Sequence, residues 1–108
     1  MHGRILINDD FGTGKSLQAL SLALAYRMEW PLLILCPSFL KYSWRHEILK
    51  WLPGFDLDRI QILGNEREQF RPNTSILIVN FDLAVIMLWR LQQLQLRVCI
   101  VDEAHWFS

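Results

Sequence analysis

The sequence predicts an α/β fold in which a parallel sheet carries helices on both faces. Short aliphatic runs alternate along the chain with segments whose apolar residues recur every three or four positions, which is typical of strands alternating with helices. The chain has 108 residues, of which 52% are hydrophobic and 20% charged. This composition and length predict one small domain in which many residues are buried.

Five aliphatic runs are the predicted strands. The first is expected to be a short buried strand that leads directly into a glycine-containing loop. The second is continuous and bounded by prolines, as expected for a strand covered on both faces. The predicted strands are residues 4–8, 31–36, 59–63, 75–79 and 97–102.

Three helices are predicted between these strands. The first covers residues 15–28 and stops at Trp30-Pro31, because proline removes a backbone donor and restricts the residue before it. Ser38 can cap the second helix, and Asp82 can cap a third that reaches about Gln93.

The second helix has an apolar side and ends at Pro53-Gly54. Trp44 and Trp51 share that side with two aliphatic residues, so both are expected in the core rather than stacked on bases. Lys41 and Arg45 are four residues apart, so they would share a helix face that could meet a phosphate backbone.

The stretch N-D-D-F-G-T-G-K-S-L-Q follows the first predicted strand. It matches the phosphate-binding pattern G-x-x-x-x-G-K-[ST] except at the first glycine, where Asp9 stands. Its backbone N–H groups would face an anion, Lys15 would reach the terminal phosphates, and the Ser16 hydroxyl would contact Mg²⁺. A tight turn with an exposed lysine is the alternative that the loop alone leaves open.

The motif V-D-E-A-H, residues 101–105, ends the last predicted strand. Magnesium keeps several waters, so a single strand-end carboxylate such as Asp102 can hold it. Glu103 could orient or deprotonate an attacking water, and His105 could relay the state of the phosphate site to another surface. An ordinary acidic turn is the alternative. Because ligands bind at the carboxyl ends of parallel strands, this motif and the lysine loop should meet at one edge.

Charge and cysteine content narrow the possible partners. The formal net charge is zero, so contact with nucleic acid would require a local basic patch. Cys36 and Cys99 lie in apolar runs without metal-ligand spacing, which predicts buried, reduced thiols in a cytosolic or nuclear protein. No apolar run approaches the about 18 residues of a membrane span, and no secretory signal is recognisable.

Together these motifs resemble the first lobe of the Swi/Snf-type ATPases of helicase superfamily two. The ordered motifs are D-D-F-G-T-G-K-S-L-Q-A, L-I-L-C-P-S-F-L-K-Y-S-W, I-V-N-F-D-L and V-D-E-A-H. Residues 29–53 are most similar to the annealing helicases. In this family an aspartate commonly occupies the first-glycine position. The chain departs from the family pattern at Phe11, Thr13 and Asn80, none of which removes a phosphate ligand.

The resemblance implies a RecA-like fold and a set of residue roles. The residues implied to bind ATP are Gly12, Thr13, Gly14, Lys15, Ser16 and Gln18. The residues implied to hold Mg²⁺ are Ser16 and Asp102, and those implied in catalysis are Lys15, Asp102 and Glu103. His105 would couple the site to the rest of the protein. The candidate DNA contacts are Pro37, Ser38, Lys41 and Arg45, and Asn80-Phe81-Asp82 matches a nearby family motif.

The resemblance also implies a partial lobe over residues 1–108, without the second lobe and its arginine fingers. Such an arginine contributes about 10³-fold or more in related phosphoryl-transfer enzymes, so the chain alone is not expected to turn over ATP efficiently. A partial sheet would also leave edges and apolar faces uncovered.

We therefore expect the ATP-binding portion of an ATP-dependent DNA translocase or annealing helicase, nuclear in a eukaryote and otherwise cytoplasmic, with no membrane partner. A non-catalytic nucleotide-binding or interaction module is the main alternative. A D-E-A-H RNA helicase is a third possibility, against which residues 29–53 argue.

Overall fold

A computed structural model describes residues 3–8, 15–27 and 30–103, without the side chains of Lys15 and Ser16. The described residues form a five-stranded sheet of order β1-β5-β2-β4-β3, in which every neighbouring pair is parallel. The strands are β1 (Arg4–Asn8), β2 (Leu32–Cys36), β3 (Ile60–Ile62), β4 (Ile76–Asn80) and β5 (Val98–Asp102). The predicted α/β fold with a parallel sheet is confirmed.

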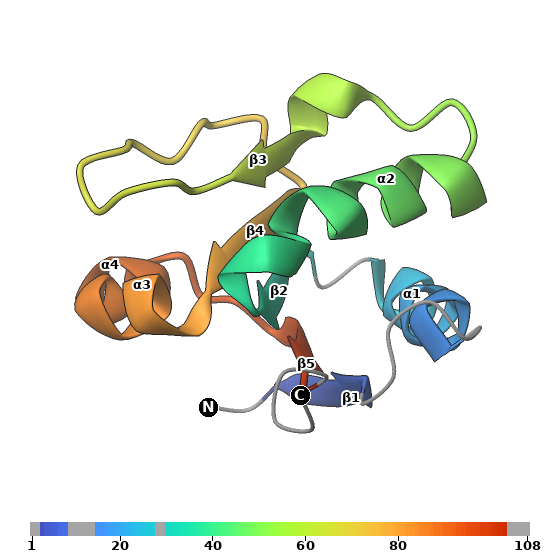
Figure 1. Cartoon of the computed structure of the whole chain (residues 1–108), viewed down its shortest axis with the longest axis horizontal. Helices are drawn as coiled ribbons and strands as arrows, with labels where there is room; N and C mark the ends of the chain where they lie inside the picture. The colour runs from blue at the N-terminus through green and yellow to red at the C-terminus, as the bar shows by residue number, and fades with distance from the viewer. Residues whose placement is uncertain (1–2, 9–14, 28–29, 104–108) are drawn as a thin grey trace.

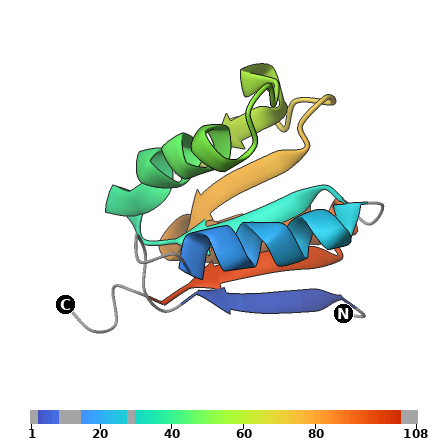
Figure 2. The ribbon, with the colours of Figure 1, turned by 90° about the vertical axis from the view of Figure 1, so that its right-hand side faces the viewer.

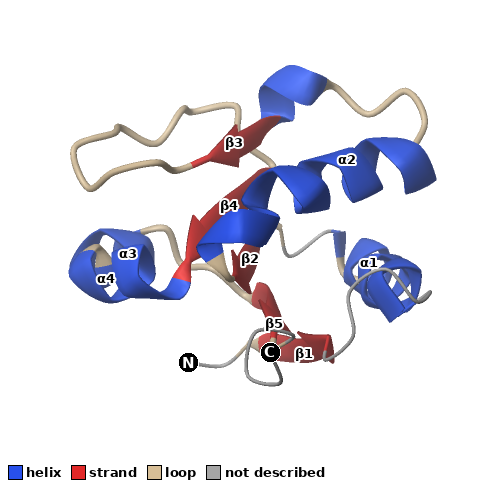
Figure 3. Ribbon diagram, viewed as in Figure 1, coloured by secondary structure: helices blue, strands red, loops and turns tan. Residues whose placement is uncertain are grey.

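Helices cover both faces of this sheet, as predicted (Figures 1 and 3). The helices are α1 (Lys15–Ala25), α2 (Lys41–Trp51), α3 (Phe81–Ile86) and α4 (Leu88–Gln93). Helices α1 and α2 pack on one face, and α3 and α4 pack on the other. No helix in the described part of the chain is long and apolar enough to cross a membrane.

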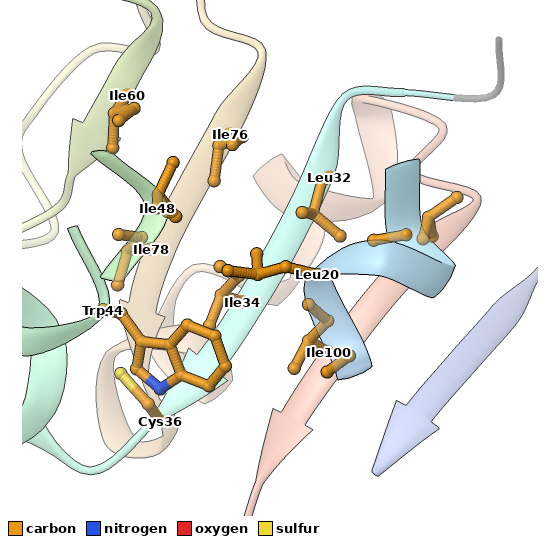
Figure 4. Close-up of a cluster of buried hydrophobic side chains, with 13 residues drawn as sticks. Leu20, Leu32, Ile34, Cys36, Trp44, Ile48, Ile60, Ile76, Ile78 and Ile100 are labelled. Atoms are coloured by element: carbon orange, nitrogen blue, oxygen red, sulfur yellow. The ribbon is translucent and has the colours of Figure 1, made fainter. Parts of the chain in front are cut away.

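The alternation of side chains along each strand builds two separate cores. The first core lies beneath α1 and α2 and contains Leu32, Ile34, Trp44, Ile48 and Ile100 among others (Figure 4). The second core lies beneath α3 and α4 and takes the alternate strand residues together with the apolar sides of those helices. Because successive strand residues point to opposite faces, each central strand contributes to both cores.

The beginnings of two predicted helices differ from the structure. Ser38 does not cap α2, because a short 3-10 helix (Ser38–Leu40) precedes it and Leu40 occupies the N-cap position without a side-chain hydrogen bond. Asn80, rather than Asp82, occupies the N-cap position of α3, again without a side-chain capping bond.

The predicted third helix is two helices rather than one. It ends at Gln93 as predicted, but Met87 has a ψ angle of 15° and separates α3 from α4. The two residues before the break, Val85 and Ile86, are β-branched and have reduced helix propensity. Each half buries its own apolar residues against the sheet, so packing retains both helices on that face.

Strand β1 is an edge strand, which corrects the prediction of a buried strand. Leu6 packs against the first core, whereas Ile5 and Ile7 on the opposite face are 58% and 55% exposed. The helices α3 and α4 cover β4 and β2 on that face (Figure 1). An apolar groove of about 660 Å³ lies between these helices and β1. Ile5, Val85 and Leu88 line this groove.

Trp44 and Trp51, expected together in the core, have different environments. Trp44 is fully buried, which confirms that prediction, whereas Trp51 is 39% exposed. Trp51 is the last residue of α2, and the partly buried Leu52 packs against the first core instead. The apolar side of α2 therefore continues to Leu52 rather than to Trp51.

Candidate functional site

Four side chains form a row along the carboxyl edge of the sheet, on the face that α1 and α2 cover. Parallel register places Asn8 opposite Asp102 and Cys36 opposite Asn80. Each follows, by two positions, a strand residue that packs in the first core, so all four point to that face. The row, in spatial order, is Asn8, Asp102, Cys36 and Asn80. We call these residues the edge row.

Asp102 is the best-anchored member of the edge row. It is fully buried, and its Oδ2 accepts a hydrogen bond of 2.7 Å from Nε1 of Trp44, which is also fully buried. A buried carboxylate requires such a partner, and hydrogen bonds to a charged group are stronger than neutral ones. Figure 4 shows Trp44 projecting from α2 toward Cys36 at the end of β2. Helix α2 thus fixes the orientation of the carboxylate at the end of β5.

Lys41 lies at the other end of the edge row and is only 7% exposed. Its Nζ donates to the backbone oxygen of Leu63 at 2.8 Å and to Oδ1 of Asn80 at 3.0 Å. The expected exposed face shared with Arg45 is therefore not formed. Because Lys41 is the first residue of α2, its side chain reaches polar groups just beyond β3 and at the end of β4.

Two other candidate DNA contacts lie on the solvent-facing side of the segment formed by the 3-10 helix and α2. Ser38 is exposed and Arg45 partly exposed, whereas Pro37 is buried. The Arg45 guanidinium lies over the Tyr42 ring, 5.0 Å from its centroid, and Tyr42 is itself exposed. Such a guanidinium–aromatic contact is worth about 0.5–1 kcal/mol at an exposed site.

Helix α1 begins at the same edge. Strand β1 ends at Asn8 and α1 starts at Lys15, and Figure 2 shows the start of α1 beside the carboxyl ends of the strands. The first N–H groups and the dipole of such a helix attract anions. Gln18 is exposed on α1. The predicted site residues Gly12, Thr13, Gly14 and His105, and the side chains of Lys15 and Ser16, lie outside the described part of the structure.

Glu103 continues the pairing of β1 and β5 beyond the sheet. Its backbone N–H donates to the carbonyl oxygen of Asn8 at 2.8 Å, and its side chain is partly exposed. The backbone next to Asp102 is therefore held in place, while the Glu103 carboxylate remains in contact with solvent.

Both cysteines are free and buried, as predicted. Burial raises the pKa of the Cys36 thiol to about 12; the nearby Asp102 carboxylate adds to this effect and the Lys41 ammonium opposes it. Burial alone raises the pKa of Cys99 to about 12. Both thiols therefore stay protonated at neutral pH and are poor nucleophiles.

Sequence reasoning missed two members of this arrangement. It placed Trp44 in the core, where a buried indole N–H usually needs an acceptor, but that acceptor is 58 residues away along the chain. It did not consider Asn8, whose side chain is 1% exposed and has no hydrogen-bond partner within the described part of the chain. A polar residue at the end of an aliphatic strand was the available signal.

The whole chain, residues 1–108, matches the model of the SNF2-related domain. The chain belongs to this family. Over 98% of its length it is 37% identical to the mouse protein named DNA annealing helicase and endonuclease ZRANB3. The human protein of that name is 36% identical over 99% of the chain. No solved structure matches the chain.

A second group of relatives carries a chromatin-regulator name. The Xenopus laevis SWI/SNF-related matrix-associated actin-dependent regulator of chromatin subfamily A-like protein 1 is 36% identical over 98% of the chain. The chain spans about a tenth of the length of these relatives, 10% of the mouse protein and 11% of the frog protein.

A double-mutant cycle tests the bond between Trp44 and Asp102. Trp44→Phe and Asp102→Ala should each lower the free energy of unfolding, and the double variant should lose less than the sum. We expect a coupling of about 1.5–3 kcal/mol, the usual range for a hydrogen bond to a charged group. Urea denaturation measures it. Trp51→Phe is the matched control, because it removes an exposed indole on the same helix that donates to Glu47. Additivity within about 0.5 kcal/mol would contradict the assignment.

The raised thiol pKa predicts a loss of stability at alkaline pH. The folded protein keeps the Cys99 proton up to about pH 12, whereas the unfolded chain releases it near the ordinary value of 9.0. The thiol therefore contributes its full stability below pH 9, and that contribution falls by up to about 1.4 kcal/mol per pH unit above it. Denaturation at several pH values should show a shallower decline in Cys99→Ala than in the wild type. Equal slopes would show that Cys99 does not titrate in this way.

Proposed function

We propose that this chain is the ATP-binding part of an ATP-dependent DNA translocase of the annealing-helicase type, which hydrolyses ATP to move along or rewind DNA. The observation that carries the proposal is the buried Asp102 carboxylate, held by Trp44 at the carboxyl edge where α1 begins. The names of the relatives support DNA as the partner. In a eukaryotic cell such a protein would work in the nucleus.

The edge row fits a magnesium-bound nucleotide. Magnesium is commonly held by one or two carboxylates together with phosphates and water, and Asp102 and Glu103, consecutive in the chain, supply carboxylates at this edge of the sheet. The start of α1 offers N–H groups to an anion. The buried side chain of Asn8, which has no partner in the described part of the chain, is a polar group that such a ligand could satisfy.

We assign the remaining roles as the sequence motif predicts. The phosphates would be held by residues of the loop and of α1, namely Gly12, Thr13, Gly14, Lys15, Ser16 and Gln18. Ser16 and Asp102 would hold Mg²⁺, which when bound neutralises charge on the phosphates. Glu103 would accept a proton from water, and its partial exposure is compatible with that role. His105 would pass the state of the site to another surface.

Helix α2 links this site to the proposed DNA surface. The segment Ser38–Trp51 contains an exposed basic and aromatic surface, in which Arg45 lies over Tyr42, and the same segment holds Asp102 through Trp44. A phosphate backbone that binds Ser38 and Arg45 would therefore act on the helix that orients the carboxylate. In this proposal Lys41 fixes the start of α2 and does not contact DNA.

A second candidate is a module that binds nucleotide without turnover and acts through protein contacts. The exposed apolar groove beside β1 favours it, because exposed apolar patches of this kind often mark interaction sites. Turnover distinguishes the two candidates. DNA-stimulated ATP hydrolysis by this polypeptide would favour the translocase, and its absence would restrict enzymatic activity to a longer parent protein.

Lys15→Ala should weaken Mg–ATP binding without unfolding the protein, because the proposed phosphate contact is a charged one. Hydrogen bonds to charged groups contribute about 1.5–3 kcal/mol, so affinity should fall by at least about tenfold. Isothermal titration calorimetry measures the affinity, and circular dichroism checks the fold. Lys50→Ala, which removes an exposed lysine on α2, is the control. If wild-type protein and Lys15→Ala bind alike, the phosphate site does not exist.

Arg45→Ala tests a proposed DNA contact, whereas Lys41→Met tests a lysine whose hydrogen bonds are internal to the fold. Arg45→Ala should weaken DNA binding and reduce the slope of log affinity against log salt by about 1. Lys41→Met should leave that slope unchanged but lower the free energy of unfolding by about 1–3 kcal/mol, because Leu63 and Asn80 lose their donor. Fluorescence anisotropy at several salt concentrations reports the slope. A reduced slope for Lys41→Met would show that Lys41 contacts DNA.

A further inference from the structure

The side chain of Asn8 is buried and has no hydrogen-bond partner among the residues that the structure describes. It is 1% exposed, and neither Oδ1 nor Nδ2 has a hydrogen-bond partner within the described part of the chain. Leaving a carboxamide in this state costs free energy, and most buried polar side chains in folded proteins are paired. An exception of this kind suggests that the partner is a ligand.

The backbone of Asn8 does not explain the choice of residue. Its carbonyl oxygen already accepts from Glu103, and the strand pairs with β5 through main-chain groups that any residue provides. Asn80 offers a comparison within the same fold. It also ends a strand in the edge row, but its Oδ1 is bonded to Lys41.

The position of Asn8 selects the kind of ligand. Its register partner is Asp102, and both side chains point to the face under α1 at the carboxyl edge. The chain between Asn8 and α1 is the predicted phosphate loop. A group in this position is next to the proposed metal-holding carboxylate and the proposed phosphate-binding segment at once.

We propose that Asn8 is a further ligand-binding residue of the magnesium–nucleotide site: Nδ2 donates to a phosphate oxygen, and Oδ1 accepts from a water bound to Mg²⁺. The inference rests on the proposed nucleotide-binding function. A carboxamide suits this position because it has both a donor and an acceptor and carries no charge that would repel phosphate. The unpaired state of Asn8 is then a cost in the free protein that ligand binding removes.

The test uses Asn8→Leu, which keeps the approximate size of the side chain. This variant should be more stable than wild type without ligand and should bind the ligand less tightly. Without ligand, the melting temperature should rise by about 4 °C, because the variant no longer buries an unpaired carboxamide. The Kd for a magnesium-bound, non-hydrolysable ATP analogue should rise by about tenfold to a hundredfold. Asn80→Leu is the matched control for stability, and its melting temperature should fall because Lys41 loses an acceptor.

A measurement on unmodified protein accompanies the variants. The ¹⁵N side-chain amide resonance of Asn8, assigned by its absence from the Asn8→Leu spectrum, should shift when the magnesium-bound analogue is added. Asn8→Ala repeats the experiment with a smaller side chain in case leucine does not fit. The inference is overturned if the resonance does not move, if Asn8→Leu binds the analogue as tightly as wild type, or if both variants melt lower than wild type or fail to fold.

The result also separates this inference from the proposed function. If Lys15→Ala and wild type bind the analogue equally poorly, the nucleotide site itself is wrong and the role of Asn8 falls with it. If Lys15→Ala weakens binding at least about tenfold while Asn8→Leu leaves it unchanged, the nucleotide site stands and only the role of Asn8 is lost.

Discussion

The hydrogen bond from Trp44 to Asp102 is the interaction on which the site depends. A carboxylate at the end of a buried strand must be paired. Here the donor is the indole N–H of Trp44, which comes from helix α2. The bond therefore fixes two things together, the orientation of the carboxylate and the position of α2. Lys41, one turn earlier on α2, ties the same helix to the ends of β3 and β4. Helix α2 is thus attached by polar bonds along the carboxyl edge of the sheet.

Helix α2 has one side in the first core and one side exposed to solvent, so it connects Asp102 with the proposed DNA surface. One side contributes Trp44 and Ile48 to the first core, and the other carries the exposed Tyr42 with Arg45 over its ring. In the proposed translocase, a contact with DNA on the outer side would be transmitted through a rigid helix to Asp102.

Much of the fold could be predicted because its signals are local. Helical spacing located α1 and α2, and five aliphatic runs located the strands to within one or two residues at each end. The errors also have local causes. Capping at Ser38 and Asp82 was wrong because a 3-10 turn or a neighbouring residue occupied the cap position. Strand β1 was predicted to be buried because aliphatic composition does not show which strand lies at the edge of the sheet.

The sequence by itself determined the order of elements and the family, because spacing and motif order are properties of the chain. Only the tertiary structure decided which side chains pair there. Trp44 and Asp102 are 58 positions apart, and Lys41 and Asn80 are 39 apart, so no local pattern records either bond. The same holds for Asn8, because its lack of a hydrogen-bond partner among the described residues depends on what surrounds it in the folded chain. Lys41 has the sequence spacing of an exposed helix residue. It is buried because the folded sheet places two acceptors, on Leu63 and Asn80, within reach of its Nζ.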